Sequence, residues 1–244
     1  MKRFASSLLA AMLVLSASSA HAETAAPPLR HLAFDLALEI TYISQAGGLR
    51  DVADPMGGGT VETKRGETHQ SSIVCDIVAA NPDGDLLVDV SETGQDRVAP
   101  LTRIVLHLDG SFGYLANQKP LDEEEVALLP FLARGYIGPA SHPVNDTWEV
   151  GSSSDKFKTK TTFRVTAMKP PDSEAVTFDE EYSSSGAEGF TGAAHGDVNY
   201  DPGRLVPQHL DLMMTTRLRQ LGTATTVRYR AAYSLKEDSF AKHA

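Results

Sequence analysis

The stretch HLAFDLALEITY, residues 31–42, alternates apolar and polar side chains with a period of two. Successive side chains of a β-strand point to opposite faces, so this period predicts a strand with one buried face. A strand of this length with one apolar face must curl on itself or pack on a second sheet to hide that face. The predicted buried face consists of Leu32, Phe34, Leu36, Leu38, Ile40 and Tyr42.

The same alternation recurs along the chain and predicts a mainly β, antiparallel protein. Turn residues at 81–84 and 109–110 separate apolar segments and predict two short hairpins. The strands fall into two halves, 32–115 and 148–235. The predicted strands cover residues 32–42, 73–79, 86–90, 104–108, 112–114, 157–167, 176–182, 205–218 and 227–235.

One helix is predicted between the two halves, at about residues 122–134. Asp122 followed by Glu125 resembles a capping box, and further acidic side chains in the first turn favour the positive end of the helix dipole. Pro130 is expected to end or kink the helix. Helix capping explains this acidic run without a catalytic role.

Three further segments are predicted to lack regular structure. Residues 51–60 contain a proline and three consecutive glycines, and residues 183–197 are rich in Ser, Gly and Ala, so both are expected to be flexible loops. Residues 236–244 show no pattern and are predicted to form a disordered tail.

The first 22 residues follow the plan of a secretion signal. Lys2 and Arg3 are followed by an apolar run, and Ala20-His21-Ala22 has the small-x-small pattern of a cleavage site. The apolar run is about a dozen residues long, too short to span a bilayer comfortably as a helix. We expect cleavage after residue 22 and an exported protein, periplasmic or secreted.

The predicted elements form a single β-rich domain over residues 23–235. The favoured fold is a strongly curved antiparallel sheet, half-barrel or barrel-like, with the short helix against its concave side. A β-sandwich is the alternative. An exported curved sheet covered by a helix is similar in architecture to the LolA-like periplasmic carriers, and the similarity implies a carrier of lipoproteins or lipids.

Charge and cysteine content narrow the function further. The chain has 32 acidic residues against 22 Lys and Arg, a formal net charge of −10. Nucleic-acid binding depends on clustered Lys and Arg, so this balance disfavours a nucleic-acid partner. Cys75 is the only cysteine, which excludes an internal disulfide, and its strand-like surroundings predict a buried apolar role.

No catalytic motif is visible in the sequence. It has no G-x-S-x-G elbow, phosphate-binding loop, H-E-x-x-H or dinucleotide-binding glycine pattern. Repeated His-x-Asp pairs place both side chains on one strand face, where they could reach one metal ion. Alternating strands produce such pairs by chance, so we expect no metal and no other cofactor. The weak metal-ligand candidates are His107, Asp109, His209 and Asp211.

The favoured function is a non-enzymatic envelope carrier that holds an apolar ligand or lipid inside the curved sheet. One alternative is a structural or protein-interaction module with a fully packed core and an envelope protein as partner. A hydrolase with its site in the two long loops is the third hypothesis. The residues expected to face the ligand are Phe34, Leu36, Leu38, Ile40, Trp148, Phe163, Tyr229 and Tyr233.

Overall fold

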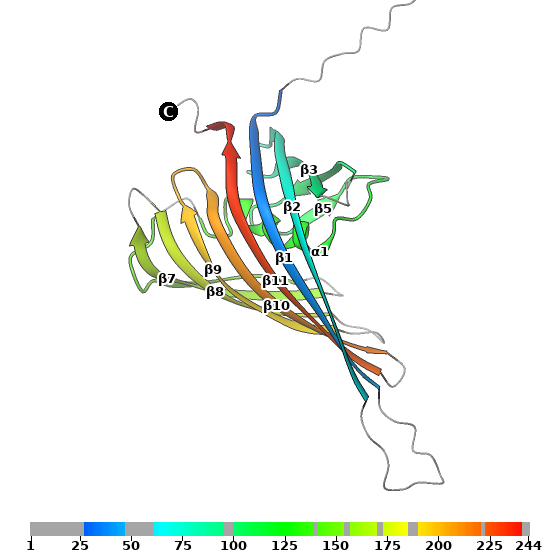
Figure 1. Ribbon diagram of the computed structural model, residues 1–244. Coiled ribbons are helices and arrows are strands. Elements are labelled where there is room, and N and C mark those ends of the chain that lie inside the picture. The colour runs from blue at the N-terminus through cyan, green and yellow to red at the C-terminus, as the bar shows by residue number, and fades with distance from the viewer. Residues whose placement is uncertain are drawn as a thin grey trace, which may run out of the picture.

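The computed structural model contains one antiparallel sheet of eleven strands (Figure 1). It describes residues 27–46, 61–94, 100–138, 141–153, 157–169, 173–184, 190–220 and 223–240. The strand order is β5-β4-β3-β2-β1-β11-β10-β9-β8-β7-β6, so the first and last strands are neighbours in the middle of the sheet. The sequence therefore runs outward from β1 to one edge and returns from the other edge to β11.

The strands vary from three to twenty residues in length. Their bounds are β1 Arg30–Ala46, β2 Val61–Ala80, β3 Leu86–Gly94, β4 Thr102–Leu106, β5 Phe112–Tyr114, β6 Thr147–Ser153, β7 Phe157–Lys169, β8 Ser173–Ser184, β9 Phe190–Asp201, β10 Val206–Gln220 and β11 Thr223–Asp238.

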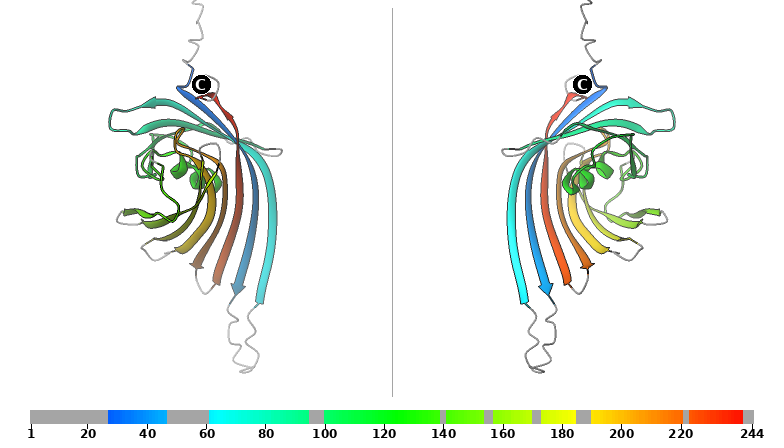
Figure 2. Two further views of the ribbon diagram at one scale, coloured as in Figure 1. Left: turned by 90° about the vertical axis from the view of Figure 1, so that its left-hand side faces the viewer. Right: turned by 90° about the vertical axis from the view of Figure 1, so that its right-hand side faces the viewer.

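The sheet is curled but not closed, and its two edges are β5 and β6. Figure 2 shows the helical segment inside the curl, with β3 to β5 on one side of it and β6 and β7 on the other. The prediction of a strongly curved antiparallel sheet with one short helix against its concave side is confirmed. Within the described residues there is no second sheet, so the sandwich alternative is wrong.

The helical segment consists of α1, Glu123–Leu128, followed directly by the 3₁₀-helix η1, Leu129–Leu132. The predicted capping box is present, and the Asp122 backbone N–H donates to Glu125 Oε2 at 2.8 Å. Pro130 lies in the first turn of η1, where its missing N–H costs nothing, so the α-helix gives way to a tighter turn there.

The concave face of the central strands packs against this helix. The buried side chains of β1 alternate as predicted from Phe34 to Ile40, whereas Ala33 is also buried beside a register shift. Leu36 lies opposite Tyr233 of β11. The Tyr233 hydroxyl donates to the backbone carbonyl of Glu124 at 2.8 Å, which joins the middle of the sheet to the first turn of α1. The helix is thus docked on the part of the concave face where Tyr233 lies.

The prediction of a loop at residues 183–197 is wrong over most of that range. Strand β8 continues to Ser184, and β9 begins at Phe190. Gly192, Ala194 and Gly196 are regular members of β9, paired on one side with β8 and on the other with β10. A run of small residues usually indicates a loop. Here aromatic side chains of β8 lie over the glycines of β9, as described below.

Several element boundaries also differ from those expected, among them those of β2 and β11. Strand β2 begins at Val61, twelve residues before the predicted start, because the exposed residues that precede Ile73 pair with the far half of β1. Strand β11 continues to Asp238, past the expected start of the tail. Arg30 Nε and Nη2 contact the two Asp238 carboxylate oxygens at 3.0 and 2.8 Å, which fixes the end of β11 against the start of β1.

Cys75 is fully buried on β2, and burial, with Glu125 and Asp76 nearby, raises the pKa of its thiol. The expected signal at 1–22, the expected loop at 51–60 and residues 241–244 of the expected tail lie outside the described residues. Across the part of the chain that is described, no helix has the length and apolar character needed to cross a membrane.

Candidate ligand-binding cavity

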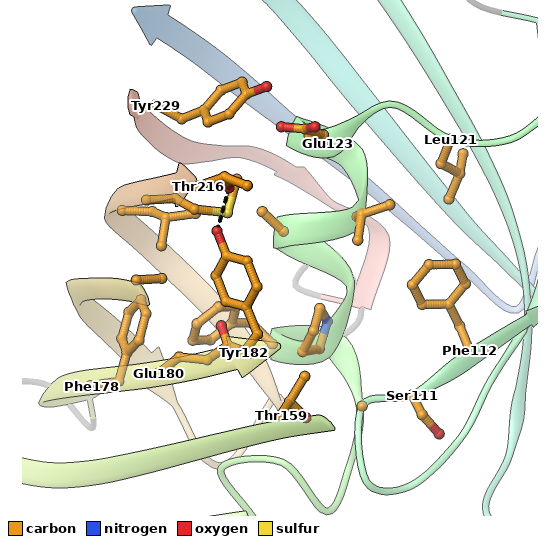
Figure 3. Close-up of a pocket in the computed structure, with 18 of the residues that line it drawn as sticks. Ser111, Phe112, Leu121, Glu123, Thr159, Phe178, Glu180, Tyr182, Thr216 and Tyr229 are labelled. Carbon is orange, nitrogen blue, oxygen red and sulfur yellow. Dashed lines mark hydrogen bonds between the residues drawn. The ribbon is translucent and has the colours of Figure 1, made fainter. Parts of the chain in front are cut away.

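A partly enclosed cavity of about 1100 Å³ lies between the helix and the concave face of strands β8 to β11 (Figure 3). Turn residues before β5 and the side chains of Phe112 and Tyr114 form another part of its wall. Most of the lining is apolar. The sheet side chains that line it are Tyr42, Thr159, Phe178, Glu180, Tyr182, Ala194, Leu212, Met214, Thr216, Val227 and Tyr229.

The small residues of β9 make this part of the concave face hollow. The strand register places Tyr182 of β8, Gly192 of β9 and Thr216 of β10 side by side. A Cβ atom at Gly192 would overlap the Tyr182 ring, which therefore lies across the glycine. The Tyr182 hydroxyl then reaches the Thr216 hydroxyl at 2.5 Å, the hydrogen bond drawn in Figure 3.

One end of the cavity is closed by aromatic rings. Phe131 of η1 lies 5.1 Å from Phe178 of β8 and 5.4 Å from Tyr136, measured between ring centroids. Tyr136 contacts the ring of Phe163 at 5.0 Å, and its hydroxyl hydrogen-bonds to Thr161 Oγ1 at 3.0 Å. These contacts hold the helical segment over β7 and β8, so the wall at this end is rigidly packed.

Three carboxylates of the described residues line the cavity, and two of them have partners. Asp109 accepts hydrogen bonds from the backbone N–H and the hydroxyl of Ser111, at 2.9 and 2.6 Å. Glu123 hydrogen-bonds to Tyr229, and Figure 3 shows these two side chains facing each other. Burial, and then this bond to Glu123, raises the pKa of the Tyr229 hydroxyl.

The third carboxylate, Glu180 of β8, lies in one cross-strand row with Ala194 of β9, Met214 of β10 and Tyr229 of β11. No donor or cation among the described residues contacts it, and burial alone raises its pKa to about 7. A carboxyl with a raised pKa in the folded state is protonated more readily there than in the unfolded chain. Its ionisation therefore destabilises the fold as the pH rises from about 4.5 to 7.

The structure places the eight expected ligand-facing residues mostly in the packed core. Tyr229 alone among them lines the cavity. Trp148 is half-buried on β6, stacked between His142 and Phe163 with ring-centroid distances of 4.1 and 5.2 Å. The remaining six are buried core side chains, namely Phe34, Leu36, Leu38, Ile40, Phe163 and Tyr233.

The weak metal-ligand candidates lie apart from the cavity, except for Asp109. His209 Nε2 is 3.0 Å from Asp211 Oδ2 on the exposed surface of β10. His107 Nδ1 is 2.7 Å from Asp85 Oδ2. In the described part of the chain, no three His, Cys, Asp or Glu side chains gather closely enough to hold a metal ion.

Sequence reasoning missed Glu180, Tyr182 and the small face of β9. One signal was present in the sequence. Every second residue of β8 from Val176 to Tyr182 lies on the same strand face, and Glu180 is the one acidic residue among these otherwise apolar or aromatic side chains. An acidic residue on such a face either has a partner in the core or faces a cavity. The strand register distinguishes the two cases, because it determines which side chains lie beside the acid.

The sequence matches no known protein-family model and no curated protein.

Proposed function

We propose that this protein is an exported, non-enzymatic carrier that binds an apolar ligand or the acyl chain of a lipid in the cavity of the curled sheet. The observation that carries the proposal is the cavity of about 1100 Å³, which the short helix leaves unfilled. Small-molecule sites are concave, largely apolar and typically about 300–1,000 Å³ in volume, so this cavity is large enough for a long chain. A fully packed interaction module would not need it.

The expected affinity follows from the burial of methylene groups. A sixteen-carbon chain would gain about 13 kcal/mol if fully buried, at about 0.8 kcal/mol per methylene. The loss of translational and rotational freedom opposes binding by at least about 4 kcal/mol. The remainder, at most about 9 kcal/mol, corresponds to a dissociation constant of about 0.3 μM or weaker.

Export supports the same role, because a carrier of apolar molecules is useful in an aqueous compartment outside the cytoplasm. The signal-like pattern of residues 1–22 supports a periplasmic or secreted location. Intact-mass analysis of the protein recovered from the envelope or medium tests this part. Retention of residues 1–22 would contradict it.

The binding proposal is tested by titration with the uncharged fluorophore 1-N-phenylnaphthylamine. We expect saturable binding that hexadecanol competes away. Ala194→Trp should reduce the affinity for the fluorophore at least tenfold, because Ala194 is buried on the cavity face between Glu180 and Met214. The matched control is Ala193→Trp, on the exposed opposite face of β9, which should bind like the original protein.

Far-UV circular dichroism must show the same β spectrum for both variants. The carrier proposal fails if the original protein shows no saturable binding and organic extraction of native protein yields no lipid. In that case the protein-interaction module becomes the better hypothesis.

A further inference from the structure

Glu180 is placed where a ligand would meet it. It projects from the concave face of β8, and its cross-strand neighbours are Thr161 of β7 and Ala194 of β9. Ala194 is too short to cover it, so the carboxylate borders the cavity rather than the packed core. Figure 3 shows Glu180 at the cavity wall beside Phe178 and Tyr182.

Nothing in the described part of the protein neutralises this carboxylate. The groups that approach it from other elements are the hydroxyls of Thr161 and Tyr136, which hydrogen-bond to each other. Tyr182, on its own strand, bonds to Thr216 instead. A buried ion without a partner is costly, and a glutamine or leucine here would remove that cost.

The cavity as a whole is electronegative. Glu180 shares it with Glu123 and Asp109, and none of the described residues that line it is Lys, Arg or His. Asp109 and Glu123 already accept hydrogen bonds from Ser111 and Tyr229, so Glu180 is the carboxylate left for a ligand. An anionic head group would be repelled by all three carboxylates, whereas a cation would be attracted by all three.

We propose that the cavity binds a long-chain amphiphile whose polar end is a protonated amine, and that Glu180 is the residue that binds the amine. This inference rests on the proposed function and specifies the class of ligand. An ammonium group would donate charge-assisted hydrogen bonds to the carboxylate, which are roughly twice as strong as neutral ones. The alkyl chain would extend over Ala194 and Met214 toward Val227.

The proposal predicts a dependence on pH. The amine binds the ionised form of Glu180, and a pKa of about 7 makes that form scarce at pH 5.5 and dominant at pH 8. Apparent affinity scales with the fraction of protein in the competent form, so it should rise roughly thirtyfold between these pH values. An uncharged ligand of the same chain length should show no such rise.

The experiment compares dodecylamine, dodecanol and dodecanoate as competitors of 1-N-phenylnaphthylamine, each below its micelle concentration, at pH 5.5 and pH 8. For the original protein at pH 8 we expect dodecylamine to bind at least tenfold more tightly than dodecanol, and dodecanoate to bind most weakly. Glu180→Gln should reduce the affinity for dodecylamine to that for dodecanol and leave the affinity for dodecanol unchanged. The adjacent Glu181→Gln, on the exposed opposite face, is the control and should change neither.

The outcomes separate this inference from the proposed function. Equal binding of the three ligands, tightest binding of dodecanoate, or an unchanged dodecylamine affinity in Glu180→Gln would overturn the amine inference and leave the carrier proposal standing. If neither the fluorophore nor any of the three ligands binds, both fall. The pH dependence of the original protein needs no substitution, so the inference stays testable even if Glu180→Gln folds poorly.

Discussion

The glycines of β9 provide a sharp test of why the concave face is hollow. Gly192 and Gly196 both lie in regular strand, so a β-propensity argument predicts the same modest effect for Gly192→Ala and Gly196→Ala. The contacts predict different effects. The atoms nearest to a Cβ at Gly192 would be those at the end of the Tyr182 ring, whereas at Gly196 the nearest would be the backbone oxygen of Asp211, followed by the Phe178 ring.

The size of each effect follows from what can move. Tyr182 can swing into the cavity, so Gly192→Ala loses the hydrogen bond to Thr216, about 0.5–1.5 kcal/mol, and regains about 0.4–1 kcal/mol from the less flexible unfolded chain. The net cost is below about 1 kcal/mol. Gly196→Ala forces β9 and β10 apart, an overpacking that costs about 3 kcal/mol.

Denaturant unfolding measures both differences, and the melting temperatures should differ by about 4–8 °C between the two variants. Gly113→Ala is the control, because a Cβ there has no heavy atom within 4 Å and should change stability little. Gly192→Ala should also weaken fluorophore binding, since the displaced ring occupies the cavity. The reasoning is refuted if Gly196→Ala is as stable as Gly192→Ala, or if Gly192→Ala binds the fluorophore unchanged.

Two further predictions concern the cavity wall and the helix. The free energy of unfolding should fall between about pH 4.5 and 7, by up to about 3 kcal/mol, because Glu180 ionises less readily in the folded state. In Glu180→Gln this decrease in the free energy of unfolding should be absent, and in Glu181→Gln it should remain. Tyr233→Phe should lower the free energy of unfolding by about 1 kcal/mol, through loss of the bond to the Glu124 carbonyl. Denaturant titration of Tyr233→Phe checks this prediction. An unchanged unfolding midpoint would show that the hydrogen bond does not stabilise the docking of the helix on the sheet.

Much of the fold was predictable because one physical signal, the period of two, is strong along most strands. It failed where the two faces of a strand do not differ in polarity. The first half of β2, before Gln70, is mostly exposed on both faces and carries no alternation. Strand β9 does alternate, but its inward face begins with Gly192 and Ala194, and a glycine is easily taken as a loop residue when its cross-strand neighbours are unknown.

The candidate site was harder to predict than the fold. The large apolar residues of β1 looked like ligand contacts, yet those from Phe34 to Ile40 are buried in the core on a strand paired with β2 and β11. Which part of an apolar face stays open depends on where the helix docks, and that is fixed by long-range contacts such as the bond from Tyr233 to the carbonyl of Glu124. The sequence contained the polar residue of the site, Glu180, without indicating what lay opposite it.

Two features of the concave face act against the stability of the empty protein. Ala194 of β9 forgoes the packing that a larger side chain would provide, and Glu180 is held in a poorly solvated position without a partner among the described residues. A ligand that fills the hollow and carries a cation relieves both costs at once. Binding to the folded state alone then raises stability by RT ln(1 + [L]/Kd), so the features that weaken the empty protein are those that couple its stability to the ligand. Selection for stability alone would remove them, and their occurrence in one cross-strand row of β8 and β9 is what a binding site explains.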